Sequence, residues 1–513
     1  MPVTASSLRP TTSDVLLSEV ARAVSGDRRG ADVQVSGITH DSRAVHDGDV
    51  YVAFAGARFH GSEFIEQAMA NGAVAVLTDE IGAAVADAVG LSCVVVADVR
   101  QVLGTASSTI YGNPAKSMTM VGITGTNGKT TTAYLLDAAL RAAGRTTGLI
   151  GTITTTIDGE SVASIRTTPE ATDLFALLAV MKERGVDAVV MEVSSHALVM
   201  GRVNGITFDA MGFTNLSQDH LDFHHTMDEY LAAKALAFLP AHSRHGVVMV
   251  LNDESQAWSR SLIAQAQVPL TIVSAQELSI EAADVTFTVD SGAQQSATLT
   301  SSTGAFEVST QMAGSWNVLN AVLAEQLAIA VGVSADLAAE GIASLTSVPG
   351  RLESVQVVGN AIAGFVDYAH TPDAVEQVLS QLRALTGTHR KLVTVIGCGG
   401  DRDALKRPLM GAAAARWADV VVITDDNPRS EDPAVIRTAV MTGAASANAS
   451  ASLVNVADRQ AAIQQAVDLA GPDGLVAVLG KGHETGQEVA GVVTPFDDRV
   501  ALRRALGGAQ RLH

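Results

Sequence analysis

The sequence predicts an α/β protein whose domains are built on parallel β-sheets. From Met118 onwards, short runs rich in valine and isoleucine alternate with helix-patterned segments, and this alternation is typical of a parallel sheet covered by helices. The composition, 47% hydrophobic but only 4% aromatic, describes an alanine- and valine-rich globular chain rather than a disordered one. At 513 residues the chain exceeds what one hydrophobic core usually organises, so we expect about three domains.

Two turn-rich segments mark the expected domain boundaries. Residues 1–117 should form a smaller N-terminal α/β domain, whose apolar runs VYVAFAG, GAVAVLTD and SCVVVAD precede the turn-rich exit YGNPAKS. Residues 118–347 should form a central domain with a P-loop-type parallel sheet, which ends near SVPGRLE. Residues 348–513 should form a C-terminal Rossmann-like α/β domain.

The elements of the central domain are expected in the following order. A strand at residues 120–123 enters a glycine turn and then a helix, and VVMEVSS and GVVMVLND are further strands. Residues 286–309, rich in threonine, serine and valine, predict a β-hairpin excursion, and WNVLNAVLAEQLAIAVGV predicts a helix.

The C-terminal domain repeats one pattern. KLVTVIGCGGDRD, ADVVVITDDNPRS and GLVAVLGKGHE each combine a strand with a polar, glycine-containing loop. A parallel sheet gathers such loops along one edge, which predicts a substrate-binding cleft there.

Charge and cysteine content exclude several classes of protein. The formal charge of −20 argues against a nucleic-acid partner, because phosphate backbones bind clustered Lys and Arg. Cys93 and Cys398 stand in apolar, strand-like runs, where we expect reduced core residues rather than a disulfide framework or a metal site. The chain lacks an apolar run of membrane-spanning length and a signal-peptide pattern, so we expect a cytoplasmic protein without membrane insertion.

The segment MTMVGITGTNGKTTT carries the strongest chemical signal. Gly125 and Gly128 would let backbone N–H groups approach phosphate oxygens at the start of a helix, where the dipole also favours an anion. Lys129 would supply positive charge, and the Thr130 hydroxyl a Mg²⁺ ligand. The strict P-loop pattern has glycine where Ile123 stands, so a glycine-rich turn without ligand is the alternative.

Polar residues follow the next strand and the next helices. Glu192 lies at the end of the apolar strand in VVMEVSS, shortly before two serines and a histidine, so it is a candidate Mg²⁺ ligand, with a solvated strand-end carboxylate as the alternative. His220, His224 and His225 suggest zinc, but without cysteines or a His-Glu-x-x-His pattern we favour contact with nucleotide or substrate. Lys234 lies in an amphipathic segment, where composition alone predicts an exposed lysine.

Residues near the second boundary and in the last loops add charges of both signs. Arg351 and the cluster of Asp367, Tyr368, His370 and Asp373 would close over a nucleotide when domains move, with solvated linker residues as the alternative. GGDRD, DDNPR and GKGHE place arginine and carboxylates on adjacent loops. Arginine grips a carboxylate and an acidic group receives an ammonium, so an amino acid is indicated, with an interloop salt-bridge network as the alternative.

In this order, the motifs resemble those of the Mur ligase family, and most of all the branch that adds the third peptide residue to UDP-N-acetylmuramoyl-L-alanyl-D-glutamate. The resemblance begins at HDSRAVHDGDVYVAFAG and runs nearly to the C-terminus. The motifs are GTNGKTT, MEVSSH, DHLDFH, the helix around Lys234, GSWNVLNA, PGRLE, DYAHTPD, GCGGDRDALKRPLMG, DDNPR and GKGHE.

The resemblance implies an enzyme that uses ATP and Mg²⁺. It implies catalytic roles for Lys129, Glu192, Lys234 and His220. In the family the lysine at the position of Lys234 is carbamylated, and the resulting anion helps position Mg²⁺ together with Thr130 and Glu192. The implied nucleotide-binding residues are Gly125, Thr126, Asn127, Gly128, Lys129, Thr130, Thr131, Asn317, Arg351 and Asp367.

Two further sets of residues are implied for the other substrates. UDP-N-acetylmuramoyl-dipeptide would contact His40, Ser42, Ala57, Arg58 and Phe59 in a UDP-binding N-terminal domain, and Thr167, Thr168, Ser194 and Arg202 in the central one. meso-Diaminopimelate, with which the DNPR motif is associated in the family, would contact Arg402, Asp426, Asn427, Pro428, Arg429, Gly480 and Glu484. Two positions depart from the family pattern: Met200 stands where glutamine is common, and Trp316 replaces the usual aromatic residue.

The expected reaction is amide formation through an acyl phosphate on the D-glutamyl side chain, in peptidoglycan precursor synthesis. Rival readings are the same ligation with L-lysine or another diamino acid, a folylpolyglutamate synthase-like ligase, and a nucleotide-driven switch. The UDP-type first domain argues against the folate ligase, and the resemblance implies small-molecule substrates and a monomer.

Overall fold

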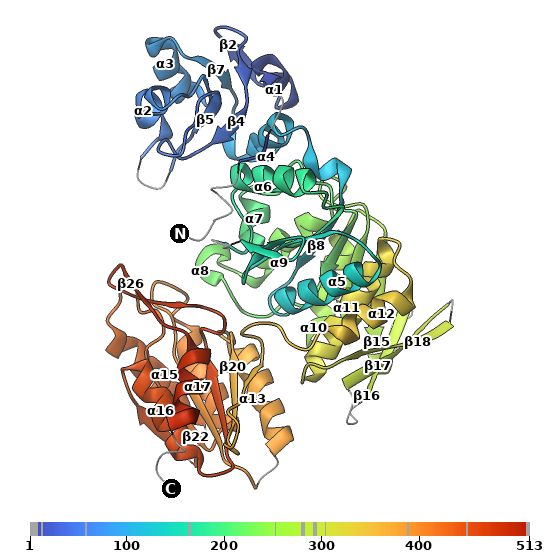
Figure 1. Cartoon of the computed structure of the whole chain (residues 1–513), viewed down its shortest axis with the longest axis vertical. Coiled ribbons are helices and arrows are strands. Elements are labelled where there is room, and N and C mark those ends of the chain that lie inside the picture. The colour runs from blue at the N-terminus through green and yellow to red at the C-terminus, as the bar shows by residue number, and fades with distance from the viewer. Residues whose placement is uncertain are drawn as a thin grey trace.

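The computed structural model describes residues 9–11, 14–56, 59–162, 166–251, 253–278, 283–290, 295–302, 304–386, 389–447 and 450–508. Its elements form an N-terminal, a central and a C-terminal unit that follow one another along the long axis, from blue through green and yellow to red in Figure 1. Each unit is an α/β structure around its own main sheet, so the predicted fold class is confirmed. None of the described helices combines the length and the apolar character needed to cross a membrane.

The N-terminal unit is a small parallel sheet with helices on both sides. Its elements are β1 (Val15–Leu16), α1 (Leu17–Ala23), β2 (Asp27–Arg29), β3 (Gln34–Val35), β4 (Gly37–Thr39), β5 (Asp49–Ala53), η2 (Gly61–Phe64), α2 (Ile65–Ala70), β6 (Ala75–Thr78), α3 (Glu80–Val89), β7 (Ser92–Val95), α4 (Val99–Ile110) and η3 (Pro114–Ser117). The main sheet has the order β2-β7-β6-β5-β4, with β4 to β7 parallel. The three apolar runs of the sequence form β5, β6 and β7, which are buried throughout because both faces of a parallel sheet are covered.

The central unit contains the largest sheet. Its elements are β8 (Thr119–Thr124), α5 (Lys129–Ala142), β9 (Thr147–Ile150), β10 (Thr155–Ile157), β11 (Glu160–Val162), α6 (Ala171–Glu183), β12 (Ala188–Glu192), α7 (Ser195–Val199), β13 (Ala210–Phe213), α8 (Leu221–His224), α9 (Met227–Ala235), η4 (Leu236–Phe238), β14 (Gly246–Val250), α10 (Asp253–Gln265), β15 (Leu270–Ala275), η5 (Gln276–Leu278), β16 (Val285–Asp290), β17 (Gln295–Ser301), β18 (Gly304–Thr310), α11 (Ser315–Ala330) and α12 (Ala335–Ser344). The sheet order is β11-β10-β9-β12-β8-β13-β14-β15-β16-β17-β18.

The position of β8 in this sheet explains where a ligand can bind. β8 pairs in parallel with β12 on one side and with β13 on the other. The carboxyl ends of these three strands therefore open onto the same edge, which brings the glycine turn, Glu192 and the loop after β13 together.

The predicted hairpin at residues 286–309 is larger than expected and is not an excursion. β16, β17 and β18 pair antiparallel with one another, but β16 also pairs in parallel with β15, so all three continue the main sheet. Apolar residues that alternate along these strands, such as Phe287, Leu299 and Val308, are buried in the core beneath α11. The sequence predicted the antiparallel pairing but not this non-local strand pairing.

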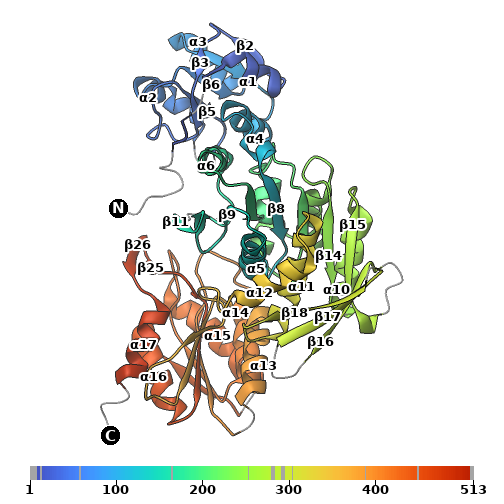
Figure 2. The same ribbon diagram turned by 45° about the vertical axis from the view of Figure 1, so that its right-hand side comes forward.

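The C-terminal unit has a second parallel sheet. Its elements are β19 (Glu353–Val355), β20 (Ala363–Asp367), α13 (Pro372–Thr386), β21 (Leu392–Ile396), α14 (Lys406–Trp417), β22 (Val420–Ile423), α15 (Pro433–Ala447), β23 (Ser452–Asn455), α16 (Arg459–Ala470), β24 (Leu475–Leu479), β25 (Gly486–Val489), β26 (Val492–Pro495) and α17 (Asp498–Gly508). The order β19-β20-β24-β21-β22-β23 makes β24, β21 and β22 neighbours, and their parallel pairing gathers the three predicted strand-end loops at one edge. Figures 1 and 2 both place the β25–β26 hairpin on the side that faces the central unit.

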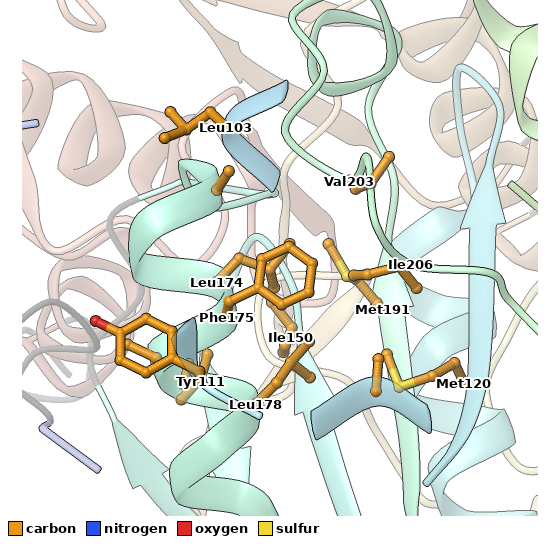
Figure 3. Packing of buried hydrophobic residues seen from close by; sticks show 14 of the residues in the cluster. Leu103, Tyr111, Met120, Ile150, Leu174, Phe175, Leu178, Met191, Val203 and Ile206 are labelled. Carbon is orange, nitrogen blue, oxygen red and sulfur yellow. The ribbon is translucent and has the colours of Figure 1, made fainter. Parts of the chain in front are cut away.

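The N-terminal and central units share one hydrophobic core. Figure 3 shows Leu103 of α4 above Leu174 and Phe175 of α6, with Met120 of β8 and Met191 of β12 beside them. All five side chains belong to a single buried cluster, which extends through both units. The C-terminal unit has separate clusters on the two faces of its own sheet.

Candidate functional site

The turn after β8 has the backbone shape that a phosphate loop needs. Gly125 and Gly128 adopt φ of 143° and 86°, values that favour glycine, and α5 begins directly afterwards at Lys129. A Cβ on Gly125 would lie 1.8 Å from Oγ1 of Thr214, so no larger residue fits. Nζ of Lys129 donates to the carbonyl oxygens of Gly125 at 3.0 Å and of Thr126 at 2.8 Å. The lysine thus spans the loop, and burial lowers its pKa against the opposing effect of Glu192.

Glu192 connects this loop to the neighbouring strand ends. Its side chain is buried, which excludes the solvated carboxylate considered from the sequence. Oε2 accepts hydrogen bonds from Oγ1 of Thr130 at 3.0 Å and of Thr152 at 3.1 Å, and Oε1 accepts one from the Thr152 backbone at 2.8 Å. Arg351, from the far side of the second boundary, donates to the same Thr130 hydroxyl at 3.0 Å. A hydroxyl and a carboxylate oxygen side by side form a donor set that suits Mg²⁺.

Lys234 corrects the expectation of an exposed lysine. It is 1% exposed, and its Nζ lies 4.3 Å from the centre of the Tyr230 ring and donates to the Gly125 carbonyl at 2.8 Å. That carbonyl oxygen therefore accepts from Lys129 as well, so two lysines meet at the phosphate loop. Burial, and then the charge of Lys129, lower the pKa of Lys234 well below its ordinary value. Composition could not reveal this, because the contact joins residues 109 positions apart.

The histidine segment forms an aromatic cluster beside the loop. His220 adopts a left-handed conformation with φ of 55°, and its ring meets His196 edge-on, with centroids 4.8 Å apart. His196 stacks on Phe223, and His224 shares a hydrogen bond of 2.8 Å with Oγ of buried Ser195. Within the described ranges, no three His, Cys, Asp or Glu side chains are arranged to hold a metal ion.

A cavity of about 230 Å³ lies between the central and C-terminal units. Sequence-predicted residues that line it are Thr126, Asn127, Gly128, Lys129, Thr130, Thr131, Thr167, Glu192, Ser194, His220, Asn317, Arg351 and Asp367. Trp316, Tyr368 and His370 also line it. The cavity thus contains most of the residues expected on the nucleotide side.

The cavity residues that the sequence reasoning missed include Thr152, Asn215, Asp219 and Asn320. Thr152 follows β9, a strand that the motif search did not use. Asn320 is one turn after the predicted Asn317, and its Oδ1 would lie 2.4 Å from a Cβ on Gly128. Asp219 directly precedes His220, so attention to acidic neighbours of the histidine would have found it.

The residues expected to contact the muramoyl-dipeptide in the central unit continue the Glu192 network. Oγ1 of Thr168 donates to the Glu192 backbone carbonyl at 2.9 Å, and the Thr167 hydroxyl lies 3.0 Å from that of Thr152. Arg202 pairs with Glu170 at 2.7 Å and contacts Sδ of Met200 at 3.5 Å. The sulfur is a weak acceptor, so Met200 offers only a weak hydrogen bond at a position where glutamine is common in the family.

The predicted UDP-side residues lie in the N-terminal unit. Nδ1 of His40 is 3.0 Å from Oγ1 of Thr172 in α6, which joins this unit to the central one. Ser42 donates to Gln67 at 2.8 Å, and Phe59 is 60% exposed. The predicted positions Ala57 and Arg58 lie outside the described residues.

The predicted diaminopimelate residues meet at the edge of the C-terminal sheet, apart from the lining of the cavity. Asn427 donates to Oε2 of Glu484 at 2.8 Å, and fully buried Lys481 donates to both Asn427 at 3.0 Å and Glu484 at 2.8 Å. Arg429 donates to the Gly400 carbonyl at 2.6 Å. Asp426 and Pro428 are buried, Gly480 has φ of 113° with Asp426 beside it, and Arg402 is exposed.

The DNPR loop is held in place by the β25–β26 hairpin. The backbone N–H of Arg429 donates to the Glu488 carbonyl at 3.2 Å, and the Ala490 N–H donates back to Arg429 at 2.7 Å. Arg429 itself adopts φ of 52°. Pairing with β25 therefore fixes a loop whose backbone is otherwise unfavourable.

Family models match three consecutive stretches of the chain. The Mur ligase family, catalytic domain, covers residues 34–111, the Mur ligase middle domain residues 123–328, and the Mur ligase, glutamate ligase domain, residues 350–482. The chain belongs to the Mur ligase family, as the motifs of its sequence predicted.

Individual relatives cover almost the whole chain. A protein of Streptomyces avermitilis named UDP-N-acetylmuramoyl-L-alanyl-D-glutamate--2,6-diaminopimelate ligase is 49% identical over 506 residues, 96% of this chain and 97% of that protein. A UDP-N-acetylmuramyl-tripeptide synthetase of Leifsonia xyli subsp. xyli is 42% identical over 491 residues, 94% of each. A solved structure of a UDP-N-acetylmuramoyl-L-alanyl-D-glutamate--2,6-diaminopimelate ligase superposes with a TM-score of 0.65 at 30% identity, covering 97% of this chain and 100% of that one.

Proposed function

We propose that this protein is an ATP-dependent ligase that adds meso-diaminopimelate to the D-glutamyl side-chain carboxylate of UDP-N-acetylmuramoyl-L-alanyl-D-glutamate, in peptidoglycan precursor synthesis. The observation that carries the proposal is the cavity in which the phosphate loop meets Arg351 and Asp367, in a chain 49% identical to a ligase of that name. A free carboxylate is a poor electrophile, so amide formation in water requires activation. Transfer of the γ-phosphoryl group of ATP gives an acyl phosphate, which the amine of the amino acid attacks with release of phosphate.

The phosphate loop supplies the electrostatic part of this chemistry. Backbone N–H groups at the start of α5 would face phosphate oxygens, and Lys129 would leave the loop carbonyls to neutralise charge during transfer. Thr130 and Glu192 would hold Mg²⁺, which when bound would offset further phosphate charge. Arg351, which stacks on Tyr368 at 4.6 Å and contacts Thr130, would bring the C-terminal unit to the same phosphates.

Lys234 is suited to carbamylation. Its lowered pKa favours the neutral amine, the form that reacts with carbon dioxide. The carbamate would carry negative charge beside Lys129 and the Gly125 carbonyl, where the amines of both lysines now donate to one acceptor. It could then help Glu192 and Thr130 to position Mg²⁺.

The acceptor substrate would extend from the N-terminal unit to the cavity. We assign the uridine diphosphate end to His40, Ser42 and residues 57–59, and the dipeptide end to Thr167, Thr168, Ser194 and Arg202. The support is the hydrogen-bonded continuity from Thr168 through Glu192 to Thr130, which would place the D-glutamyl carboxylate near the phosphate loop.

The amino acid would bind at the edge of the C-terminal sheet. Arg429 and Arg402 would take the distal carboxylate, and Glu484 with Asp426 would receive the distal ammonium. Lysine lacks that carboxylate, so it would leave the arginines unpaired.

An amino-acid panel tests the proposal. Purified enzyme receives ATP, Mg²⁺ and the UDP-muramoyl-dipeptide with diaminopimelate, lysine, ornithine or diaminobutyrate, and phosphate release is measured together with product mass. We expect ligation with diaminopimelate, abolished in Lys129→Met and retained in Lys182→Met, an exposed lysine of α6. Formation of a lysine-containing product at a comparable rate would show that the enzyme is a lysine-adding ligase. Phosphate release without any amino acid would instead favour a nucleotide-driven switch.

A further inference from the structure

Asp219 links the two units that enclose the cavity. It lies on the loop after β13 and is buried. Its Oδ1 accepts from the His220 backbone at 2.9 Å and lies 3.5 Å from Nζ of Lys406, at the start of α14 in the C-terminal unit. Its Oδ2 lies 3.4 Å from Nε2 of His220 and 3.9 Å from Nε2 of His370. One central carboxylate thus faces two side chains of the C-terminal unit.

Of the three side chains that face Asp219, Lys406 is the one that is not a histidine, so its positive charge does not require a protonated imidazole. Nδ1 of His370 lies 2.8 Å from the Tyr368 carbonyl, so a neutral ring donates there and presents an unprotonated Nε2 to Asp219. Burial lowers the pKa of His370, which favours this neutral form. Burial alone would raise the pKa of Asp219, but its neighbours hold it below its ordinary value, and Lys406 is the one among them that is charged when the imidazoles are neutral. Asp219 is therefore an anion, and the buried ammonium of Lys406 is its counter-ion also when both histidines are neutral.

The start of α14 also reaches the amino-acid loops. Arg407, next to Lys406, donates to Glu431 at 2.7 Å and to the Gly399 carbonyl at 3.4 Å. Glu431 in turn accepts the Asp401 backbone N–H at 2.5 Å. The two adjacent buried cations therefore have different partners: Lys406 faces Asp219 of the central unit, and Arg407 joins the GGDRD loop to the segment after DNPR.

We propose that Asp219 and Lys406 are positioning residues whose ion pair seats the C-terminal unit on the central unit and so aligns the amino-acid loops with the phosphate loop. The proposal rests on the proposed ligase function. Asp219 and His370 line the cavity but Lys406 does not, which suits a residue that acts on domain placement rather than on phosphate. The pair can form only when the two units are together, so it contributes to the reacting complex and not to ATP binding by the central unit alone.

A double-mutant cycle tests the pair. Lys406→Met and Asp219→Asn should each lower kcat about 10- to 100-fold, while KM for ATP changes less than about twofold. Because both variants break the same ion pair, kcat of the double variant should lie within about threefold of kcat of the slower single variant. Lys406→Arg keeps the charge and should recover most of the rate. Lys391→Met, an exposed lysine of the same unit, is the matched control and should keep wild-type kcat.

Small-angle X-ray scattering measures the radius of gyration, which reports domain closure and does not change merely because activity is lost. With a non-hydrolysable ATP analogue and the UDP-muramoyl-dipeptide, wild type and Lys391→Met should reach one radius of gyration, and Lys406→Met should remain larger. Losses that multiply in the double variant, a raised KM for ATP at unchanged kcat, or equal scattering of all variants would overturn the proposal. If wild-type protein forms no amide, the proposed function fails first, so the two failures are distinguishable.

Discussion

The buried ion pair between Arg459 of α16 and Asp498 of α17 gives a prediction whose magnitude follows from the contacts. Both side chains are fully buried, and Nε and Nη2 of Arg459 donate to the two carboxylate oxygens at 2.7 Å each. The same guanidinium donates to the Leu479 carbonyl at 3.0 Å and to the Asp425 carbonyl at 3.3 Å. These two carbonyls directly precede Gly480 and Asp426, so the pair stabilises both the unit and the loops to which we assign the amino acid.

Arg459→Met should destabilise the C-terminal unit by about 3–5 kcal/mol, because it leaves the Asp498 carboxylate buried without a counter-charge. Since about 1.4 kcal/mol is a factor of ten, hydrogen-exchange protection of the β20 and β24 amides should fall by roughly two to four decades. Arg459→Met/Asp498→Leu removes both charges and should recover most of that loss. Arg503→Met, exposed on α17, should stay within about 0.5 kcal/mol of wild type. Protection in Arg459→Met within about threefold of wild type would refute this reasoning.

Three further predictions concern single side chains. Arg429→Ala should raise KM for diaminopimelate about 10- to 100-fold, from loss of charge-assisted hydrogen bonds, and leave KM for ATP within about twofold in steady-state kinetics; equal increases in both would indicate misfolding. Lys481→Met should raise KM for diaminopimelate with a similar selectivity over ATP, because Asn427 and Glu484 lose the ammonium between them; an unchanged value would show that Glu484 needs no fixed orientation. Glu325 is fully buried, and burial raises its pKa to about 8. Its protonated form therefore contributes stability that is complete below the ordinary pKa of 4.5 and is lost as pH rises through about 8, so thermal unfolding at pH 5 and pH 8 should differ less in Glu325→Gln than in wild type. A pH dependence identical in both proteins would contradict the assignment.

The phosphate loop was predictable because its signal is local. The strand, the two glycines, Lys129 and the helix after it are consecutive in sequence, and the backbone shape that glycine permits is what the structure has. The three strand-end loops of the C-terminal unit were predictable for a similar reason, because strand, loop and helix alternate there and parallel pairing puts their ends at one edge.

Contacts between distant segments were not predictable from pattern. Burial of Lys234 depends on the Gly125 carbonyl, and the role of Asp219 depends on Lys406, which lies in another unit. The sequence predicts the strands after β15 as a separate hairpin, because no local pattern indicates that β16 pairs with β15. In each case the deciding interaction joins residues that sequence periodicity treats independently.

The shared core of the first two units has a mechanical consequence. Leu103, Phe175 and Met120 lie in one buried cluster, so opening a gap between those units would expose apolar surface to water at high cost. The C-terminal unit keeps its own cores, and the side chains that join it to the central unit include Trp316 and the Asp219–Lys406 pair. During turnover the C-terminal unit should therefore move against one rigid body formed by the N-terminal and central units. The rate of product release should depend on how often the C-terminal unit moves away from that body.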